Sequence, residues 1–130
     1  MKLFGVGTDI IQVNRLKKSL KKKLFESRVF SKEEITKCKS TKRNSNCFAK
    51  RFAAKEAFSK ALGTGISKGI NFNEIIVLNE KSGKPYIKLI NKTKKIVERK
   101  LKKKRYKISL SISDEKDYAV AFVTISTWKK

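Results

Sequence analysis

Histidine is absent from this chain of 130 residues, and its absence excludes several kinds of functional site. A Ser–His or Cys–His catalytic pair cannot form without it. Cysteine is scarce as well, since Cys38 and Cys47 are the only two, and a zinc cluster of cysteines and histidines therefore lacks ligands. We expect both cysteines to be plain thiols, as in most intracellular proteins.

Long apolar runs are also missing. No stretch approaches the roughly 18 apolar residues that a membrane-spanning helix needs, and no charged-then-apolar signal segment follows Met1. We therefore expect a cytoplasmic protein without a membrane partner. With 39% hydrophobic residues, the chain suits a single domain over residues 1–130 with one modest core.

Acidic residues are few: 11 aspartates and glutamates stand against 34 lysines and arginines, which gives a formal charge of +23. Such a chain attracts polyanions, namely nucleic acid, an anionic membrane, a phosphorylated small molecule or an acidic protein. Most of the basic residues are lysines, and isoleucine and asparagine are also plentiful. A compositional bias that places lysine on solvated faces produces the same charge, so charge alone does not select a partner.

The spacing of apolar residues predicts an α+β fold, in which a largely antiparallel sheet packs with a long central helix and shorter helices. Ser31 and Glu34 have the spacing of a capping box at a helix start. Gly83 lies in the hairpin signature KSGK. The expected elements are a strand at 3–8, a basic amphipathic helix at 13–25, a helix at 31–39, the central helix at 48–62, a hairpin at 74–90, a basic helix at 92–105 and a closing hairpin at 107–127.

The central helix has two different faces and is expected to end at Gly63 and Gly65. One face is apolar and is expected to meet the core. The other consists of small residues around Glu56 and Lys60, which lie one turn apart, and alanines there would allow a close neighbour. The apolar face carries Phe48, Phe52, Ser59 and Leu62, and the small face carries Lys50, Ala53, Glu56, Ala57 and Lys60.

Two acidic residues suggest a metal site, although each also has a simpler explanation. The segment GVGTD at 5–9 is no dinucleotide fingerprint, because Ile10 stands where the third glycine belongs. Asp9 taken alone is more typical of a helix cap, and Glu56 with Lys60 of a weak helical ion pair. If Asp9 and Glu56 meet in space, however, they could hold Mg²⁺ together with substrate phosphates, with Lys60 nearby.

Four segments together resemble the holo-acyl-carrier-protein synthases, the small bacterial type of phosphopantetheinyl transferase. They are GVGTDI, RFAAKEAFSKALGTGI, SGKPYI and SLSISDEKDYAVAFV, in this order along nearly the whole chain. The resemblance implies transfer of the phosphopantetheine arm of coenzyme A to a serine of apo acyl carrier protein, which releases adenosine bisphosphate. It also implies Mg²⁺, an acidic carrier protein as partner, and a homotrimer with active sites between subunits.

The resemblance assigns roles to individual residues. Asp9 and Glu56 hold Mg²⁺ against the diphosphate, and Lys60 neutralises the leaving group. The base that takes the serine proton stays open between a Mg²⁺-bound water and either carboxylate acting through water. The predicted coenzyme A contacts are Arg51, Lys55, Ser59, Lys60, Gly63, Thr64, Gly83, Lys84, Pro85 and Ser109. Carrier docking is assigned to Arg15 by resemblance, and to Lys18, Lys21 and Lys22 by charge and helix face.

One departure from the family pattern keeps other functions open. Ser109 and Asp114 stand where relatives have histidines, and Ser109 could keep one hydrogen bond to coenzyme A. A degenerate member that binds without turnover is therefore one alternative. A basic nucleic-acid-binding protein is another, but most phenylalanines lie on apolar stripes rather than on exposed basic strands, so no specific nucleic acid is expected.

Overall fold

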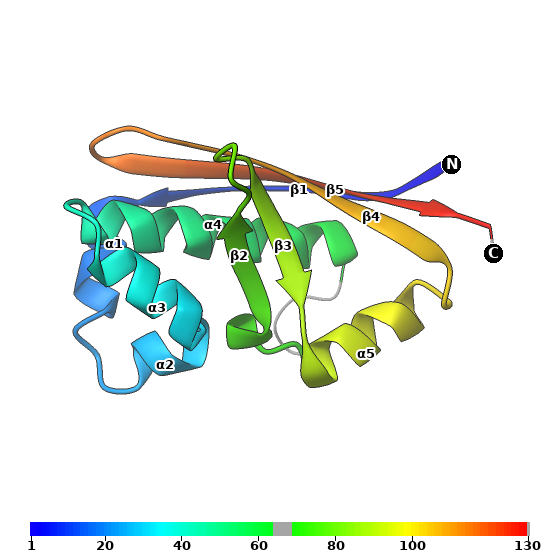
Figure 1. Cartoon of the computed structure of the whole chain (residues 1–130), viewed down its shortest axis with the longest axis horizontal. Coiled ribbons are helices and arrows are strands. Elements are labelled where there is room, and N and C mark those ends of the chain that lie inside the picture. Colours follow the sequence, from blue (N-terminus) through cyan, green and yellow to red (C-terminus); the bar gives the residue numbers. More distant parts are fainter. Residues whose placement is uncertain (64–68, 130) are drawn as a thin grey trace.

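The computed structural model describes residues 1–63 and 69–129, and it contains two antiparallel sheets packed with helices (Figure 1). Strands β1 (Lys2–Gln12), β5 (Tyr118–Trp128) and β4 (Arg105–Asp114) form one sheet, in the order β1-β5-β4. Strands β2 (Ile75–Asn79) and β3 (Pro85–Leu89) form the other. Every strand pair is antiparallel, which confirms the predicted α+β class. The helices are α1 (Val13–Ser19), α2 (Phe25–Val29), α3 (Lys32–Lys39), α4 (Asn44–Leu62) and α5 (Asn91–Lys100), with a 3-10 turn at Phe72–Glu74.

The long helix α4 forms the centre of the molecule and packs directly on the three-stranded sheet (Figure 1). This close approach depends on two glycines of β1, because a Cβ atom at Gly5 or Gly7 would overlap the carbonyl oxygen of Ala61 or Ala57. The small face of the central helix therefore receives a close neighbour, as predicted, and that neighbour is β1. Gly63 ends the helix in a left-handed conformation, with φ of 84°.

All the helices lie on one side of the three-stranded sheet, so the described elements leave its other face uncovered (Figure 1). Side chains of β5 alternate accordingly between buried and exposed positions. Several apolar residues on the edge strand β1 and the central strand β5 remain exposed, which is unusual for a sheet face. They include Val6, Ile10, Tyr118, Val120 and Phe122.

The capping box and both hairpins form as predicted. The Ser31 hydroxyl accepts a hydrogen bond from the Glu34 backbone N–H, and the Glu34 carboxylate accepts one from the Ser31 N–H. Gly83 adopts φ of 95° in the turn between β2 and β3. Among the described residues, no helix has the length and apolar character needed to cross a membrane.

Several predicted boundaries are wrong, and the two basic helices are too long in the prediction. The first ends at Ser19 instead of residue 25, and the chain turns there through hydrogen bonds from the Lys21 N–H to the Lys18 carbonyl oxygen and from the Lys22 N–H to the Ser19 carbonyl oxygen. Leu24 adopts φ of 69° and stays 53% exposed, so it does not join the apolar stripe. The other ends at Lys100, and the run of basic residues after it turns back into β4. Strand β1 continues past residue 8 and includes Asp9, which therefore caps no helix.

The expectation that both cysteines are plain thiols is also wrong. Cys38, near the end of α3, and Cys47, in the first turns of α4, are joined by a disulfide with their Cα atoms 5.3 Å apart. The pairing depends on how two helices meet in space, which sequence spacing does not specify. The bond ties α3 to the start of the central helix.

Candidate functional site

The side chain of Asp9 meets the central helix at Lys60. Strand β1 turns Gly5, Gly7 and Asp9 toward α4, and the two glycines let the strand lie close enough for this contact. The Lys60 Nζ lies 3.3 Å from the Asp9 Oδ1 and donates to the Thr8 carbonyl oxygen at 3.0 Å. The structure thus brings together two predicted site residues that lie far apart in the sequence.

Glu56 adds a second carboxylate to this contact, one helical turn before Lys60. Burial raises the pKa of Asp9, and Lys60 opposes that change. Burial also raises the pKa of Glu56, the charge of Asp9 raises it further, and Lys60 again opposes. The two carboxylates therefore interact unfavourably across the β1–α4 contact, which is the situation that a bound cation relieves. We call Asp9, Glu56 and Lys60 the carboxylate cluster.

The chemistry of this cluster fits Mg²⁺ better than a metal held entirely by protein. Throughout the described part of the chain, no three His, Cys, Asp or Glu side chains group together as metal ligands. Mg²⁺ often binds through one or two carboxylates and completes its shell with water and substrate phosphates. Asp9 and Glu56 provide such a pair.

A pocket of about 230 Å³ connects the carboxylate cluster to helix α1. Asp9, Glu56 and Arg15 supply polar groups to its lining, so the predicted docking residue Arg15 faces the same space as the carboxylates. The rest of the lining is largely apolar, and sequence reasoning gave none of those residues a role in the site. It consists of Ile10, Ile11, Leu16, Ser19, Phe25 and Phe52.

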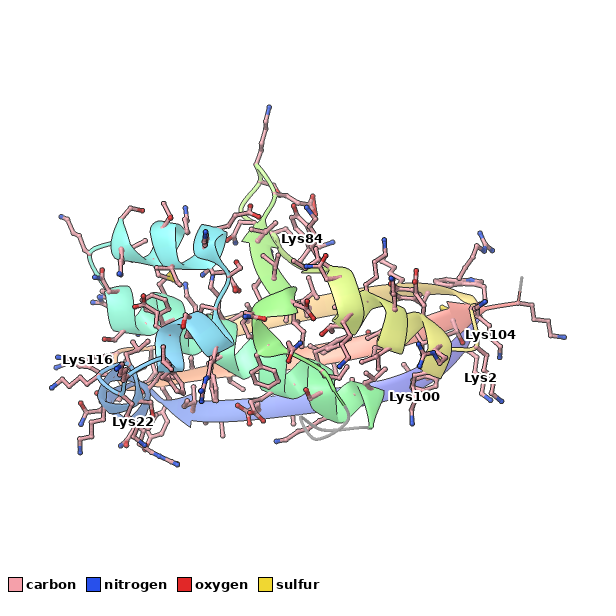
Figure 2. The ribbon with its side chains drawn as sticks, turned by 90° about the horizontal axis from the view of Figure 1, so that it is seen from below. Lys2, Lys22, Lys84, Lys100, Lys104 and Lys116 are labelled. Carbon is pink, nitrogen blue, oxygen red and sulfur yellow. A yellow bond between two sulfur atoms is a disulfide. The ribbon has the colours of Figure 1, made fainter. Side chains whose placement is uncertain are left out.

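The predicted docking lysines lie around α1 but not all on it. Lys18 is an exposed residue of the helix, whereas Lys21 and Lys22 are exposed in the turn that follows its end. Lys22 lies at the end of the molecule opposite Lys100 and Lys104 (Figure 2). The basic surface beside the pocket is therefore formed by a helix and a turn together.

Arg51 lies on another side of α4, about 140° around the helix from Glu56. It is 6% exposed, and its Nη2 donates to the Asn79 Oδ1 at 3.2 Å. The Asn79 amide donates in turn to the Gly83 carbonyl oxygen at 3.0 Å, which links α4 to the β2–β3 turn. Sequence reasoning missed Asn79, because nothing in its local pattern marks it as a bridge.

A larger pocket of about 810 Å³ opens beside Arg51. Its lining includes Asn79, Tyr86, Lys32 and Lys37, and we call it the arginine pocket. The Arg51 Nε is buried and has no hydrogen-bond partner among the described residues. Phosphate oxygens are the acceptors that a guanidinium group binds best.

Lys55 does not line an open groove, contrary to its predicted role. Its side chain is fully buried, and its Nζ donates to the Glu34 Oε1 and to the Phe72 carbonyl oxygen, both at 2.7 Å. Burial lowers the pKa of Lys55 to about 8, although the charge of Glu34 works in the opposite direction. The residue is an anchor of the fold. Ser59 is likewise only 4% exposed, which keeps its hydroxyl away from the surface.

The remaining predicted positions are dispersed. Gly63 is exposed at the end of α4, and Thr64 lies outside the described residues. Ser109 is exposed on the uncovered face of the sheet, opposite Thr124 of β5. At the far end of the same strand, Asp114 accepts a hydrogen bond from Asn46 at 3.1 Å and lies 4.0 Å from the Lys50 Nζ. Its negative charge is thus met by the start of α4.

Comparison with known proteins gives one consistent family. A family model described as the 4′-phosphopantetheinyl transferase superfamily matches residues 5–123. A holo-[acyl-carrier-protein] synthase of Pelagibacter ubique is 48% identical over 125 residues, covering 96% of this chain and 98% of the relative. The protein of the same name from Ehrlichia chaffeensis is 47% identical, with coverage of 96% and 98%.

Solved structures of such synthases share the fold. The Neisseria meningitidis protein aligns with a TM-score of 0.84 at 35% identity, covering 95% of this chain and 98% of that one. The Bacillus anthracis protein, in complex with CoA (3′,5′-ADP), aligns with a TM-score of 0.77 at 37% identity and coverage of 96% and 97%. The Helicobacter pylori protein, in complex with coenzyme A, gives 0.77 at 33% identity and coverage of 93% and 99%.

Proposed function

The chain belongs to the 4′-phosphopantetheinyl transferase superfamily, and we propose that its carboxylate cluster transfers the phosphopantetheine arm of coenzyme A to apo acyl carrier protein. The acceptor is a serine of the carrier, and the products are holo acyl carrier protein and adenosine bisphosphate. The observation that carries this proposal is the meeting of Asp9, Glu56 and Lys60 beside a pocket that also reaches Arg15.

Two residues of the cluster would hold Mg²⁺. Asp9 and Glu56 provide oxygen ligands of the right number and kind, and the repulsion from Asp9, which adds to burial in raising the pKa of Glu56, favours a cation between them. When bound, Mg²⁺ supplies positive charge to the diphosphate of coenzyme A. Lys60 adds a further positive charge from the exposed side of the cluster.

The remaining steps belong to the side chains of this protein and of its partner. The serine oxygen forms a bond to the β-phosphorus of coenzyme A, while the bond from that phosphorus to the oxygen of the leaving adenosine bisphosphate breaks. Lys60 stabilises the negative charge that develops on the leaving phosphate. The serine proton passes through water to Glu56 or Asp9, the two carboxylates of the cluster.

Helix α1 and the turn after it form the docking surface for the carrier in this proposal. Arg15 faces the pocket that contains the carboxylates, so a partner bound there brings its serine close to the cluster. Lys18, Lys21 and Lys22 surround it with exposed positive charge. An acidic carrier protein matches this surface, and the charge would mainly accelerate their encounter.

We further propose that the chain works as a homotrimer, in which coenzyme A lies between subunits. The carboxylate cluster and the arginine pocket lie on different sides of α4, which suits a coenzyme A molecule that contacts the cluster of one subunit and the arginine pocket of its neighbour. The turn with Gly83, Lys84 and Pro85 lies next to the arginine pocket, to which Asn79 connects it. The uncovered apolar sheet face, which also bears Ser109, gives a second copy a surface to bury.

The decisive test is the mass of the carrier. Apo acyl carrier protein is incubated with Mg²⁺, coenzyme A and this protein, and a gain of one phosphopantetheine group supports the proposal. Saturable binding of coenzyme A without any mass gain would instead indicate a degenerate member that binds without turnover. We propose that this reaction takes place in the cytoplasm, as a step of lipid metabolism.

A further inference from the structure

A second basic region lies between α5 and the start of β4, far from the carboxylate cluster. Lys100 and Lys104 gather there, together with Lys2 of β1, at the end of the molecule opposite Lys22 (Figure 2). The surface is hollowed, with a volume of about 450 Å³, and we call it the α5–β4 hollow. Its lining consists of Lys95, Glu98 and Arg99 of α5, Lys103 and Lys104 of the connecting turn, and Tyr106 of β4.

The charge of this region exceeds what the fold requires. The carbonyl groups at the end of α5 favour Arg99 and Lys100 through the helix dipole. That effect fades within one turn, yet every residue from Lys102 to Arg105 is also basic. Within the described residues, none of the four cations of the hollow has an ion-pair partner. These charges repel one another and do not stabilise the turn.

The backbone of the turn is unfavourable for the residues that form it. Lys102 and Lys103 both have left-handed conformations, with φ of 55° and 57°. Glycine adopts this conformation easily, whereas a side chain with a Cβ atom adopts it at a cost. The Lys103 N–H donates to the Glu98 carbonyl oxygen at 2.8 Å, a bond that glycine would keep. Of these two lysines, Lys103 lines the hollow and Lys102 does not.

The hollow also contains a hydrogen-bond donor other than its cations. Tyr106 is half-buried, and burial raises its pKa, with a further contribution from the charge of Glu98. Its hydroxyl group therefore keeps its proton and can donate to an anion. A concave site that combines several cations with one neutral donor is suited to phosphate oxygens, which accept several hydrogen bonds at once.

We propose that the α5–β4 hollow is a binding site for a small compound that carries two or more clustered phosphate groups. Its volume is within the range of small-molecule sites, whereas a lipid surface is flat and a nucleic-acid backbone needs an extended groove. Lys95, Arg99, Lys103 and Lys104 supply the charge, and Tyr106 supplies the neutral donor. The site does not depend on the transfer reaction proposed above.

The experiment uses inorganic tripolyphosphate with the isotope-labelled protein, in EDTA and about 150 mM salt. Addition of tripolyphosphate is expected to change the NMR chemical shifts of residues 95–106 in a saturable way, with half-saturation below about 1 mM. These changes should be larger than those at Asp9 or Glu56. Lys103→Gly is expected to weaken binding roughly tenfold by removing one charge-assisted contact. Because glycine suits the left-handed backbone, the same variant should keep or raise the midpoint of thermal unfolding.

Two matched variants and two other probes decide the outcome. Lys102→Gly makes the same backbone change outside the lining, and Lys116→Ala removes one charge at the opposite end; both should bind like the wild type. Equal weakening in all three variants would mean only a general counter-ion effect and would overturn the proposal. It would equally fail if tripolyphosphate caused no shifts, or if single-stranded RNA or phosphatidylglycerol vesicles bound through these residues while tripolyphosphate did not.

Discussion

Replacing Glu34 with glutamine should strongly destabilise the fold, because Glu34 balances the buried ammonium group of Lys55. Both side chains are fully buried, and the Glu34 carboxylate accepts hydrogen bonds from the Lys55 Nζ, the Ser31 N–H and the Val77 N–H. Glutamine keeps the capping role, since it is accepted at the same helix position. The change therefore removes the charge and one acceptor while it leaves the helix start intact.

The magnitude follows from these contacts. Removing one partner of a buried ion pair costs about 3–5 kcal/mol. The carbonyl oxygens of Phe72 and Ile75 still accept from Lys55, which favours the lower part of that range. The Val77 N–H, however, would face the glutamine NH₂ group and lose its acceptor, which adds about 1 kcal/mol or more. We expect a loss of about 4 kcal/mol in the free energy of unfolding, or roughly 15 °C in the thermal midpoint.

The pH dependence separates this explanation from a simple packing defect. Lys55 has a folded-state pKa of about 8, below the ordinary value of 10.5, so the unfolded chain binds more protons between these two values. Stability from this group therefore rises as pH rises from about 8 to 10.5. Glu34→Gln removes the negative charge that opposes the lowering of the Lys55 pKa, so this pKa falls further in the variant. The free energy of unfolding of the variant therefore begins to increase at a lower pH than that of the wild type. The stability difference between the two proteins should shrink between pH 6 and pH 9.

Chemical denaturation at both pH values measures these differences. The exposed neighbour Glu33 gives a matched control, because Glu33→Gln removes the same charge from a solvated position. The double variant Glu34→Gln with Lys55→Met should lose less stability than the sum of the single changes. A deficit under 1 kcal/mol, or one that stays constant with pH, would refute a buried and charged Lys55.

The other predictions concern the proposed reaction. Glu56→Gln should reduce transfer to the carrier, measured by mass spectrometry, at least 100-fold. The variant should keep or raise the midpoint of thermal unfolding, because burial and Asp9 disfavour the charge of Glu56. Undiminished transfer would exclude Glu56 as a metal ligand. Reversing Lys18 and Lys21 to glutamate should raise KM for the carrier far more than KM for coenzyme A, and equal effects would argue against docking there. Mixing inactive Glu56→Gln chains with inactive Lys84→Ala chains should restore part of the activity if sites lie between subunits, whereas no recovery despite proven subunit exchange would place each site in one chain.

Elements with strong local signals could be predicted from the sequence. The capping box at Ser31 and Glu34 and the glycine turn at Gly83 depend on a few neighbouring residues, and both form. The ends of the basic helices could not be placed in the same way. Lysine has a high helix propensity, so a run such as residues 100–105 continues the helical pattern. The helix ends because the buried Leu101 and the start of β4 require the chain to turn.

The two kinds of polar residue on α4 were equally hard to separate from sequence. Arg51 and Lys55 lie one turn apart and look like a solvated stripe, whereas Glu56 and Lys60 look like an ordinary helical pair. Which stripe is buried depends on the elements that pack on each side. Helix α3 and strand β2 enclose Lys55 through Glu34 and backbone carbonyls, while β1 brings Asp9 to Lys60. These contacts connect distant segments, and local periodicity does not encode them.

The buried pair also determines where the two halves of the proposed site lie relative to each other. Glu34 of α3 binds the Val77 N–H of β2 and, through Lys55, the central helix, so it joins three elements at one point. Arg51 reaches Asn79 of the same strand from one helical turn before Lys55. The anchor thus fixes the arginine pocket against the helix whose other side carries the carboxylate cluster. Stability and the geometry of the proposed coenzyme A site therefore depend on the same buried charges in this protein.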